Sequence, residues 1–325
     1  MIIDFHNHYY PPEYIEALQT GLSNIKVSID SANNPVLHSP GDKNIAVPGH
    51  RDIDYRVNVL DEVGVDKQVL TFTAPGTLTE DPDTSAGLSR RVNDALAKIA
   101  SERSDRFTAL ATLPLNNPAA SIAEFQRATN ELGFKGVMLF SNAAGVALAD
   151  QRFWPIYEQA SEVSAVMYIH PTFPVGVEAM TEYWLMPLVG FVFDTTLAAA
   201  HLVFSGVVER FPGVRWVLAH LGGTIPYLAE RLDRGYEAFS ECRSKISRPP
   251  SQYLKDFYYD TVNFDARALH LAIEFAGADR LLAGSDYPHQ IGSLEKMVSS
   301  IGALGLSDED RARILGGNTA DLLGL

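Results

Sequence analysis

The stretch Val166-Met167-Tyr168-Ile169-His170-Pro171 is a short apolar run that ends in one polar residue before a proline. A short run of this kind, with β-branched and aromatic residues, is typical of a strand buried on both faces of a parallel sheet. The same form recurs along the chain, for example from Trp216 to His220 and from Leu281 to Asp286. The pattern therefore predicts a core of buried parallel strands.

Such strands alternate with amphipathic helical stretches almost from end to end of the 325 residues. The eight expected strands are Ile2 to Tyr9, Lys67 to Thr73, Phe107 to Pro114, Phe134 to Phe140, Ala165 to His170, Arg215 to Leu221, Phe257 to Val262 and Arg280 to Ser285. Repeated βα units predict an α/β fold, a (β/α)8 TIM-type barrel that forms one domain over residues 1–325. A doubly wound open sheet is the alternative. It would require a phosphate-binding glycine-rich turn, and Gly222-Gly223 alone is too weak a signal for one.

One segment, from Asn24 to Pro48, interrupts this rhythm directly after the first expected strand. It holds three short β-like runs, separated by the turn-forming pairs Asn33-Asn34 and Pro40-Gly41. Active sites of such barrels lie at the C-terminal ends of the strands, and long insertions in compact domains are usually functional. We therefore expect a small β-stranded insertion, at about residues 24–48, that caps the active-site mouth. A loop without function is the alternative.

Composition narrows the class of protein. Lys+Arg number 26 and Asp+Glu 40, which gives a formal net charge of −14 and argues against a nucleic-acid partner. The single cysteine, Cys242, excludes an intramolecular disulfide and a thiolate metal cluster. The N-terminus has an acidic residue and two histidines where a signal peptide is basic and apolar. A membrane-spanning helix needs about 20 predominantly apolar residues, whereas the apolar stretch Leu188 to Val208 is interrupted by Asp194 and His201. We expect a cytoplasmic protein without a membrane-spanning segment.

Histidines and an aspartate stand at the ends of the expected strands. His6 and His8 end the first strand, and the two-residue period of a strand puts both on one face. Interior positions there normally hold branched apolar residues, so two imidazoles favour a metal site. Three further polar residues end apolar strands: His170, His220 and Asp286. Each alone could be a buried structural residue or a helix cap. Together the five predict a site for one divalent first-row metal ion with a position open to water or substrate.

These motifs resemble the amidohydrolase superfamily, and most closely the branch of aminocarboxymuconate semialdehyde decarboxylase, with gamma-resorcylate and carboxyvanillate decarboxylases as relatives. The motifs are His6-x-His8, His170-Pro171, His220-Leu221-Gly222-Gly223 and Gly284-Ser285-Asp286-Tyr287-Pro288. The resemblance implies that His6, His8, His170 and Asp286 bind the metal, with His220 beside it. It implies non-oxidative decarboxylation of a small, hydroxylated or aminated aromatic carboxylic acid, with His220 and Asp286 as the catalytic residues.

Several alternatives stay open at this point. The branch also contains hydrolases, so a metal-dependent hydrolase of an amide, lactone or other ring is the second hypothesis, and a metal-binding barrel without activity is the third. Three imidazoles favour Zn²⁺, and the resemblance to aromatic decarboxylases makes Mn²⁺ the alternative. Two routes for the proton are open. In one, Asp286 donates a proton to the substrate with the help of His220. In the other, His220 first helps a metal-bound water molecule to add to the substrate.

The resemblance also suggests where substrate binds. Trp184 matches a pocket-lining aromatic, and Arg231 matches an arginine that relatives lend across a dimer. His289, three residues after Asp286, stands where relatives often have a non-basic or aromatic residue. Packing or surface positions are the alternatives for all three. We expect a homodimer, from this resemblance and from the apolar region Leu185 to Val208. The histidines without a partner pattern are expected to be structural or to face solvent: His38, His50, His201 and His270.

Overall fold

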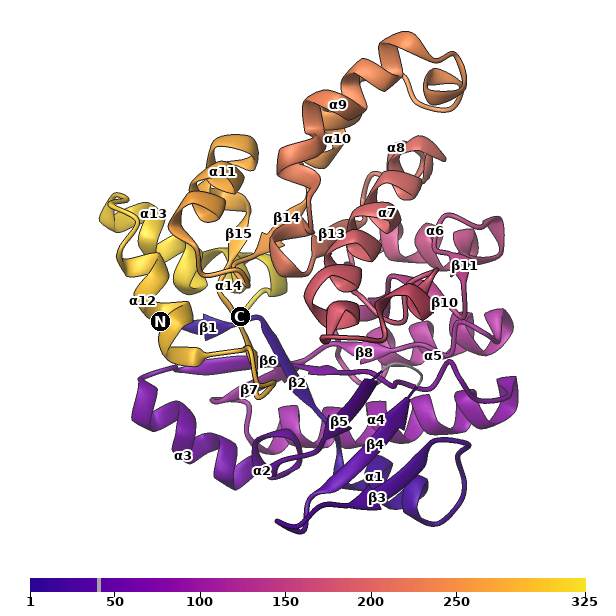
Figure 1. Cartoon of the computed structure of the whole chain (residues 1–325), viewed down its shortest axis with the longest axis vertical. Coiled ribbons are helices and arrows are strands. Elements are labelled where there is room, and N and C mark those ends of the chain that lie inside the picture. The colour runs from indigo at the N-terminus through magenta and orange to yellow at the C-terminus, as the bar shows by residue number, and fades with distance from the viewer. Residues whose placement is uncertain (40–41) are drawn as a thin grey trace.

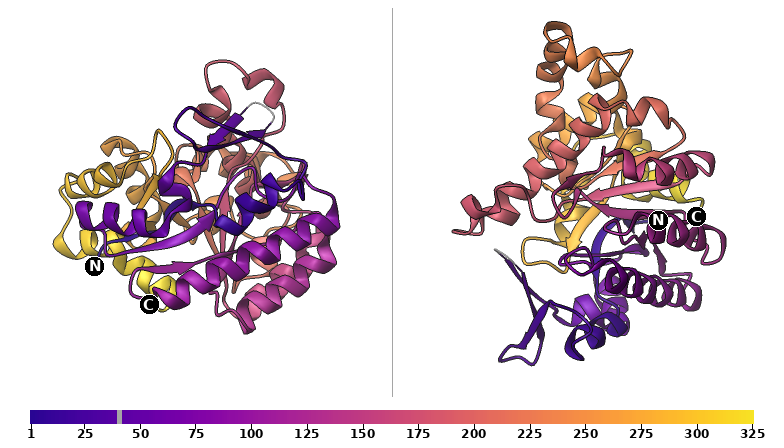
Figure 2. Two further views of the ribbon diagram at one scale, coloured as in Figure 1. Left: turned by 90° about the horizontal axis from the view of Figure 1, so that it is seen from below. Right: turned by 90° about the vertical axis from the view of Figure 1, so that its right-hand side faces the viewer.

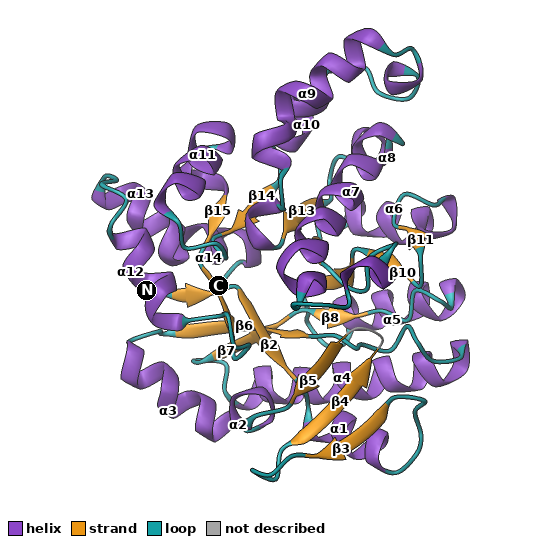
Figure 3. Ribbon diagram, in the orientation of Figure 1, coloured by secondary structure: helices purple, strands orange, loops and turns teal. Residues whose placement is uncertain are grey.

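The computed structural model describes residues 1–39 and 42–325. Short strands form its centre and helices surround them (Figures 1 and 3). The central strands are β1 (Ile3–Asp4), β2 (His6–Tyr9), β6 (Lys67–Phe72), β7 (Phe107–Ala109), β8 (Ala111–Thr112), β9 (Gly136–Phe140), β12 (Val166–His170), β13 (Arg215–Leu218), β14 (Tyr258–Asp260), β15 (Leu281–Leu282) and β16 (Gly284–Tyr287). Each of the eight predicted strands contains at least one of these described strands.

The strand pairings form two arcs, which the chain joins into one barrel. On one side, β2 pairs with β16 and β6, and β6 pairs with β7. On the other side, β8, β9, β12, β13, β14 and β15 pair in that order, and all of these pairs are parallel. The two arcs are continuous in the chain, because only Leu110 separates β7 from β8 and only Ala283 separates β15 from β16. The predicted (β/α)8 barrel is therefore confirmed, and the open doubly wound sheet is excluded.

The strands are buried as their apolar runs predict. In β12 the residues from Val166 to Ile169 are fully covered, and each pairs in register with β9. Gly136, at the start of β9, lies so close to this strand that a Cβ atom would come 2.1 Å from the Val166 carbonyl oxygen. Only glycine permits this approach of two backbones.

Amphipathic helices cover the outside of the barrel, and Figure 1 shows α9 projecting away from it. The helices are α1 (Pro12–Gln19), α2 (Pro48–Arg51), α3 (Ile53–Val63), α4 (Pro82–Glu102), α5 (Pro118–Asn130), α6 (Trp154–Glu162), α7 (Phe191–Phe204), α8 (Val207–Arg210), α9 (Ile225–Ala238), α10 (Pro250–Leu254), α11 (Ala266–Ala276), α12 (Leu294–Gly302), α13 (Asp308–Ala312) and α14 (Asn318–Leu323). The long helix α4 begins at an Asp81 cap whose side chain accepts hydrogen bonds from the Asp83 and Thr84 amides.

The predicted insertion is a small antiparallel sheet of β3 (Lys26–Ile29), β4 (Pro35–Ser39) and β5 (Asp42–Ile45), which stands out from the barrel in Figure 2. The turn predicted at Pro40-Gly41 lies outside the described residues. Leu37 of β4 is fully buried, and Asn44 of β5 donates a hydrogen bond to the Ala74 carbonyl at 3.2 Å. Ala74 follows the C-terminal end of β6, so the insertion contacts the barrel at the mouth, where the strands end.

The apolar segment Met186–Phe204 contains α7 and a preceding π-helical turn. Among the described residues it is the one helix long and apolar enough to cross a membrane by length and composition, and 44% of its window is buried. Ala199 and Leu202 pack fully into the core. Its exposed apolar residues are Leu188, Val189, Phe193 and Leu197. The segment is therefore buried on one side and exposed on the other.

Candidate metal centre and active site

The first barrel strand supplies two histidines to the mouth. His6 and His8 of β2 are fully buried, and their Nε2 atoms lie 3.1 Å apart. Side chains that are two residues apart on a strand share a face, which is why both rings reach the same point. This convergence is the one that the sequence predicts.

His170 ends β12, and its ring is oriented by the residue that follows it. Nδ1 donates a hydrogen bond to the Pro171 carbonyl at 2.8 Å, so the proton lies on Nδ1 and Nε2 keeps its lone pair. Nε2 is buried and has no hydrogen-bond partner among the described residues. The ring centroid lies 4.8 Å from that of His8 and 5.1 Å from that of His6. A buried, unpaired lone pair beside two other imidazoles fits a metal ligand.

His220 lies on an unusual turn after β13. Positive φ angles run through four consecutive residues, from His220 (52°) to Gly223 (65°). A Cβ atom on Gly222 would come 2.4 Å from the Tyr259 ring, so the turn also requires glycine for space. Non-glycine residues held in this region cost about 1–3 kcal/mol each and cluster at functional sites. The His-Leu-Gly-Gly motif thus serves to place one imidazole.

The His220 ring faces the other imidazoles. Its centroid lies 4.9 Å from that of His6 and 5.3 Å from that of His170. Burial, together with the charge of His6, lowers the pKa of His220 to about 4. The ring is therefore neutral at neutral pH, when it can both donate and accept one hydrogen bond.

Asp286 of β16 brings a carboxylate to the same place. A register shift in the pairing of β16 with β2, together with a φ of 60° at Asp286, directs its side chain toward the histidines. Oδ1 lies 2.8 Å from Nε2 of His8 and 3.4 Å from Nε2 of His6. Burial opposes ionisation, but the hydrogen bonds and charges of these two histidines outweigh it and hold the pKa of Asp286 well below its usual range.

We call these five residues, His6, His8, His170, His220 and Asp286, the mouth cluster. Ligand atoms of His6, His170, His220 and Asp286 all lie within 4.8 Å of one another, and those of His8, Asp286 and His289 do so as well. The structure thus brings together all five residues predicted from the strand ends. Imidazoles and one carboxylate, with a buried unpaired nitrogen on His170, fit a divalent first-row metal ion. That His220 stands beside the ion rather than on it stays a prediction.

Asp260, at the end of β14, is a site residue that was not predicted from the sequence. Its Oδ2 accepts a hydrogen bond from Nδ1 of His6 at 2.5 Å and one from the His220 amide at 3.1 Å. Its Oδ1 accepts from the amides of Leu221 at 3.2 Å and Val262 at 3.0 Å. Burial lowers the pKa of His6, but Asp260 and Asp286 outweigh it and raise that pKa to about 10. Asp260 therefore keeps Nε2 of His6 directed at the cluster and holds the His220 turn.

Asparagine in place of Asp260 should weaken metal binding by about 10–100-fold, because partners of this kind orient metal-ligating histidines. The amide keeps the size of the side chain but cannot offer two acceptor oxygens to His6 and the turn amides. Competition with a chromophoric chelator measures the affinity. Asp265→Asn is the matched control, because Asp265 caps α11 at a half-exposed position nearby. If both variants hold metal as tightly as the parent protein, Asp260 does not orient the ligand.

Two further histidines lie next to the cluster. The ring centroid of His289 is 4.4 Å from that of His8, and the centroid of His50 is 5.0 Å from that of His289. His50 is only 2% exposed, so of the two alternatives predicted for it, structural or facing solvent, burial fits the structural one. The turn of α2 that carries it packs against the loop after β16, which local sequence does not reveal. Trp184 is 51% exposed and Arg231 is exposed on α9, so their roles stay predictions.

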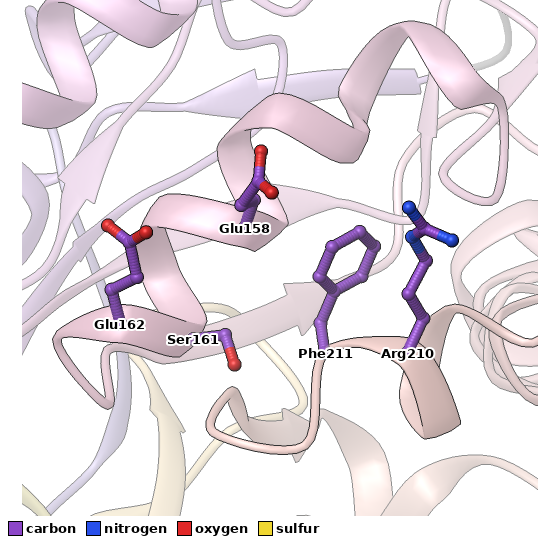
Figure 4. Close-up of a pocket in the computed structure, with 5 residues that line it drawn as sticks. All are labelled: Glu158, Ser161, Glu162, Arg210 and Phe211. Carbon is purple, nitrogen blue, oxygen red and sulfur yellow. The ribbon is translucent and has the colours of Figure 1, made fainter.

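Two cavities of the described structure lie at opposite ends of the barrel strands. Figure 4 shows one of about 340 Å³, lined by Glu158, Ser161, Glu162, Arg210 and Phe211. It lies at the end of α6, the helix that leads into β12, and hence at the opposite end of the strands from the mouth cluster. The other, of about 260 Å³, is lined by residues after β6, β9 and β12, among them Asn142 and Thr172. The second cavity lies on the mouth side, where barrels of this kind bind their ligands.

Comparison with known proteins identifies the family. A family model described as amidohydrolase matches residues 3–325. The chain is 33% identical to 2-amino-3-carboxymuconate-6-semialdehyde decarboxylase of Dictyostelium discoideum, over 84% of this chain and 77% of the relative. It is 30% identical to gamma-resorcylate decarboxylase of a Polaromonas species, over 84% and 87%.

Solved structures show the same fold. The chain superposes on 5-carboxyvanillate decarboxylase of Sphingomonas paucimobilis with a TM-score of 0.88 at 24% identity, covering 100% of this chain and 99% of the other. A dihydroxybenzoic acid decarboxylase of Polaromonas sp. JS666, with bound manganese, has a TM-score of 0.82 at 24% identity and coverage of 99% and 96%. The chain therefore belongs to the amidohydrolase family, in the branch that contains 2-amino-3-carboxymuconate-6-semialdehyde decarboxylase and gamma-resorcylate decarboxylase.

Proposed function

We propose that this protein is a metal-dependent, non-oxidative decarboxylase of a small, hydroxylated or aminated aromatic carboxylic acid. The observation that carries the proposal is the buried mouth cluster of imidazoles and one carboxylate at the strand ends. The decarboxylases among the relatives support it, because two of them share at least 30% identity with most of this chain.

We assign metal binding to His6, His8, His170 and Asp286. A bound divalent ion supplies positive charge that holds oxygen atoms of the substrate and draws electron density from the carboxylated ring. The donor set supports one Zn²⁺, and the manganese in the Polaromonas structure supports Mn²⁺ as the alternative. Metal analysis of protein purified without added metal, followed by reconstitution with each ion, distinguishes the two.

His220 and Asp286 can move the proton that the reaction needs. Loss of CO2 leaves the bonding electron pair on the ring carbon, and this carbon must then take up a proton. Asp286 is ionised, so it must receive a proton before it can donate one. His220 is neutral and has a ligand atom within 4.8 Å of Asp286, so it can carry a proton from solvent to the ring carbon or to Asp286.

The decisive experiment measures CO2 release across hydroxylated and aminated benzoates. The enzyme is the metal-loaded protein, with metal-stripped protein as the control. Release that requires metal supports the proposal and names the substrate class. If metal is bound stoichiometrically and no acid loses CO2, the proposal fails, and turnover of lactones or amides would then point to the hydrolase alternative.

We also propose that the insertion of β3, β4 and β5 caps the mouth. Its support is the hydrogen bond from Asn44 to the Ala74 carbonyl, directly beyond the end of β6. A cap there would limit the entry of water to the mouth cluster.

An exposed apolar surface supports the proposed homodimer. We call it the α7 surface, and it consists of Tyr183, Trp184, Leu188, Val189, Phe193 and Leu197. Exposed apolar side chains gathered in one segment of the chain are typical of interaction sites. Light scattering after size exclusion should give the mass of two chains for the parent protein and of one chain for a Leu188→Glu, Phe193→Glu variant. Val163→Glu, at an equally exposed position on the end of α6, should remain dimeric. A monomeric parent protein would refute the dimer.

A further inference from the structure

His50 is a buried imidazole to which the mouth cluster gives no role. It is 2% exposed, and neither Nδ1 nor Nε2 has a hydrogen-bond partner within residues 1–39 and 42–325. Buried polar groups of proteins are nearly always paired, so each exception calls for an explanation. A ligand that supplies the missing hydrogen bonds is one explanation.

The backbone around His50 is held firmly. The Tyr10 amide donates a hydrogen bond to the His50 carbonyl at 2.7 Å. The guanidinium of Arg56 donates to the Gly49 carbonyl from Nε at 3.0 Å and from Nη2 at 2.7 Å. On its other side, Gly49 lies so close to Tyr287 that a Cβ atom would come 2.4 Å from the phenolic oxygen. The position of His50 is thus set by the residue that follows β2 and by the last residue of β16.

The ring of His50 belongs to a group of neighbouring rings that reaches the mouth cluster. It stacks on Tyr10 at 5.4 Å and lies 5.0 Å from His289. The ring of His289 lies 4.4 Å from that of His8. Only the ring of His289 therefore separates His50 from His8, a proposed metal ligand.

The chemistry of His50 indicates the group that it binds. Burial lowers its pKa well below the usual range, so the ring is neutral, with one N–H donor and one lone pair. A hydroxyl group can satisfy both, because it donates and accepts. A carboxylate can only accept, and a methyl group does neither.

We propose that His50, with His289 beside it, forms a subsite for a ring hydroxyl group of the aromatic acid. This inference rests on the proposed function, and it deepens it by naming a substituent that the substrate carries in addition to the groups at the metal. The subsite differs from the mouth cluster, because His50 comes from α2.

Equilibrium binding of phenols tests the subsite without turnover. Metal-loaded protein is titrated calorimetrically with phenol and with the three benzenediols, whose second hydroxyl can reach His50 while the first stays at the cluster. We expect at least one diol to bind about tenfold more tightly than phenol, the effect of one hydrogen bond in a buried site. In His50→Phe, which keeps the stacking on Tyr10, this preference should disappear. His50→Gln should restore part of it, and His270→Phe, at an exposed position on α11, should keep it.

The outcomes separate this inference from the proposed function. A diol preference that survives in His50→Phe overturns the subsite, and so does the absence of binding of every diol to the parent protein. Should His50→Phe fail to fold, an unchanged preference in His50→Leu has the same meaning. The CO2 assay tests the proposed decarboxylation independently. Decarboxylation without a His50-dependent preference removes only the subsite, and a His50-dependent preference without decarboxylation removes only the proposed reaction.

Discussion

Replacement of His220 by alanine should lower kcat for CO2 release by about a thousandfold while the metal content stays at that of the parent protein. Proton transfer by a positioned side chain contributes roughly 10²–10⁴-fold, and His220 is the neutral imidazole that lies against the proposed ligands. Its ring makes no hydrogen bond on which Asp286 or His170 depends among the described residues. Steady-state kinetics and metal analysis of the same preparation measure the two effects.

The matched control is His201→Ala, because His201 is an exposed histidine on α7. It should leave both kcat and metal content unchanged. Loss of metal from His220→Ala would make His220 a ligand instead of a proton carrier. A kcat within threefold of the parent protein would remove His220 from the mechanism.

Arg56→Met should lower the free energy of unfolding by about 3–5 kcal/mol, because four buried neutral acceptors lose their donor at about 1–3 kcal/mol each and the removal of a buried charge offsets part of this loss. Arg56 is fully buried, and its guanidinium donates to four acceptors on three elements: the carbonyls of Gly49 and His8 and the side chains of Asn7 and Gln68. Burial lowers its pKa only to about 10, so the group stays charged at neutral pH. Methionine fills the volume but leaves these acceptors unpaired, and each such loss is costly.

Urea unfolding followed by circular dichroism measures this change. Arg90→Met is the control, because Arg90 is exposed on α4 and should change the free energy of unfolding by less than about 0.5 kcal/mol. A similarly small change for Arg56→Met would show that water or neighbouring side chains replace its hydrogen bonds.

The barrel and the five residues of the mouth cluster were predictable because both depend on local pattern. A buried strand is a continuous apolar run, and a polar residue at its end stands out, as His170 and Asp286 do. Asp260 also ends a short apolar run, Tyr258-Tyr259, but it is not among the residues predicted from the sequence. The predicted end of the sixth strand at Leu221 is too late, because β13 ends at Leu218. The backbone amides of His220 and Leu221 do not pair with a neighbouring strand. They donate hydrogen bonds to the Asp260 carboxylate, about 40 residues further along the chain.

The position of His50 could not be predicted for a related reason. It depends on the contact of Gly49 with Tyr287, two residues from opposite ends of the chain. No periodicity links a four-residue helix after the insertion with the loop after the last strand. Arg231 is a different case, because its predicted role needs a second chain.

The pairing of β2 with β16 also has a consequence for biosynthesis. His8 and Asp286 are 278 residues apart in the chain, yet their side chains meet. At a synthesis rate of 5–20 residues per second, the ribosome needs roughly 14–56 s between making the first histidine pair and the aspartate. Throughout that interval the nascent chain carries imidazoles without their carboxylate. A complete mouth cluster therefore exists only after Asp286 has been synthesised and β16 has paired with β2.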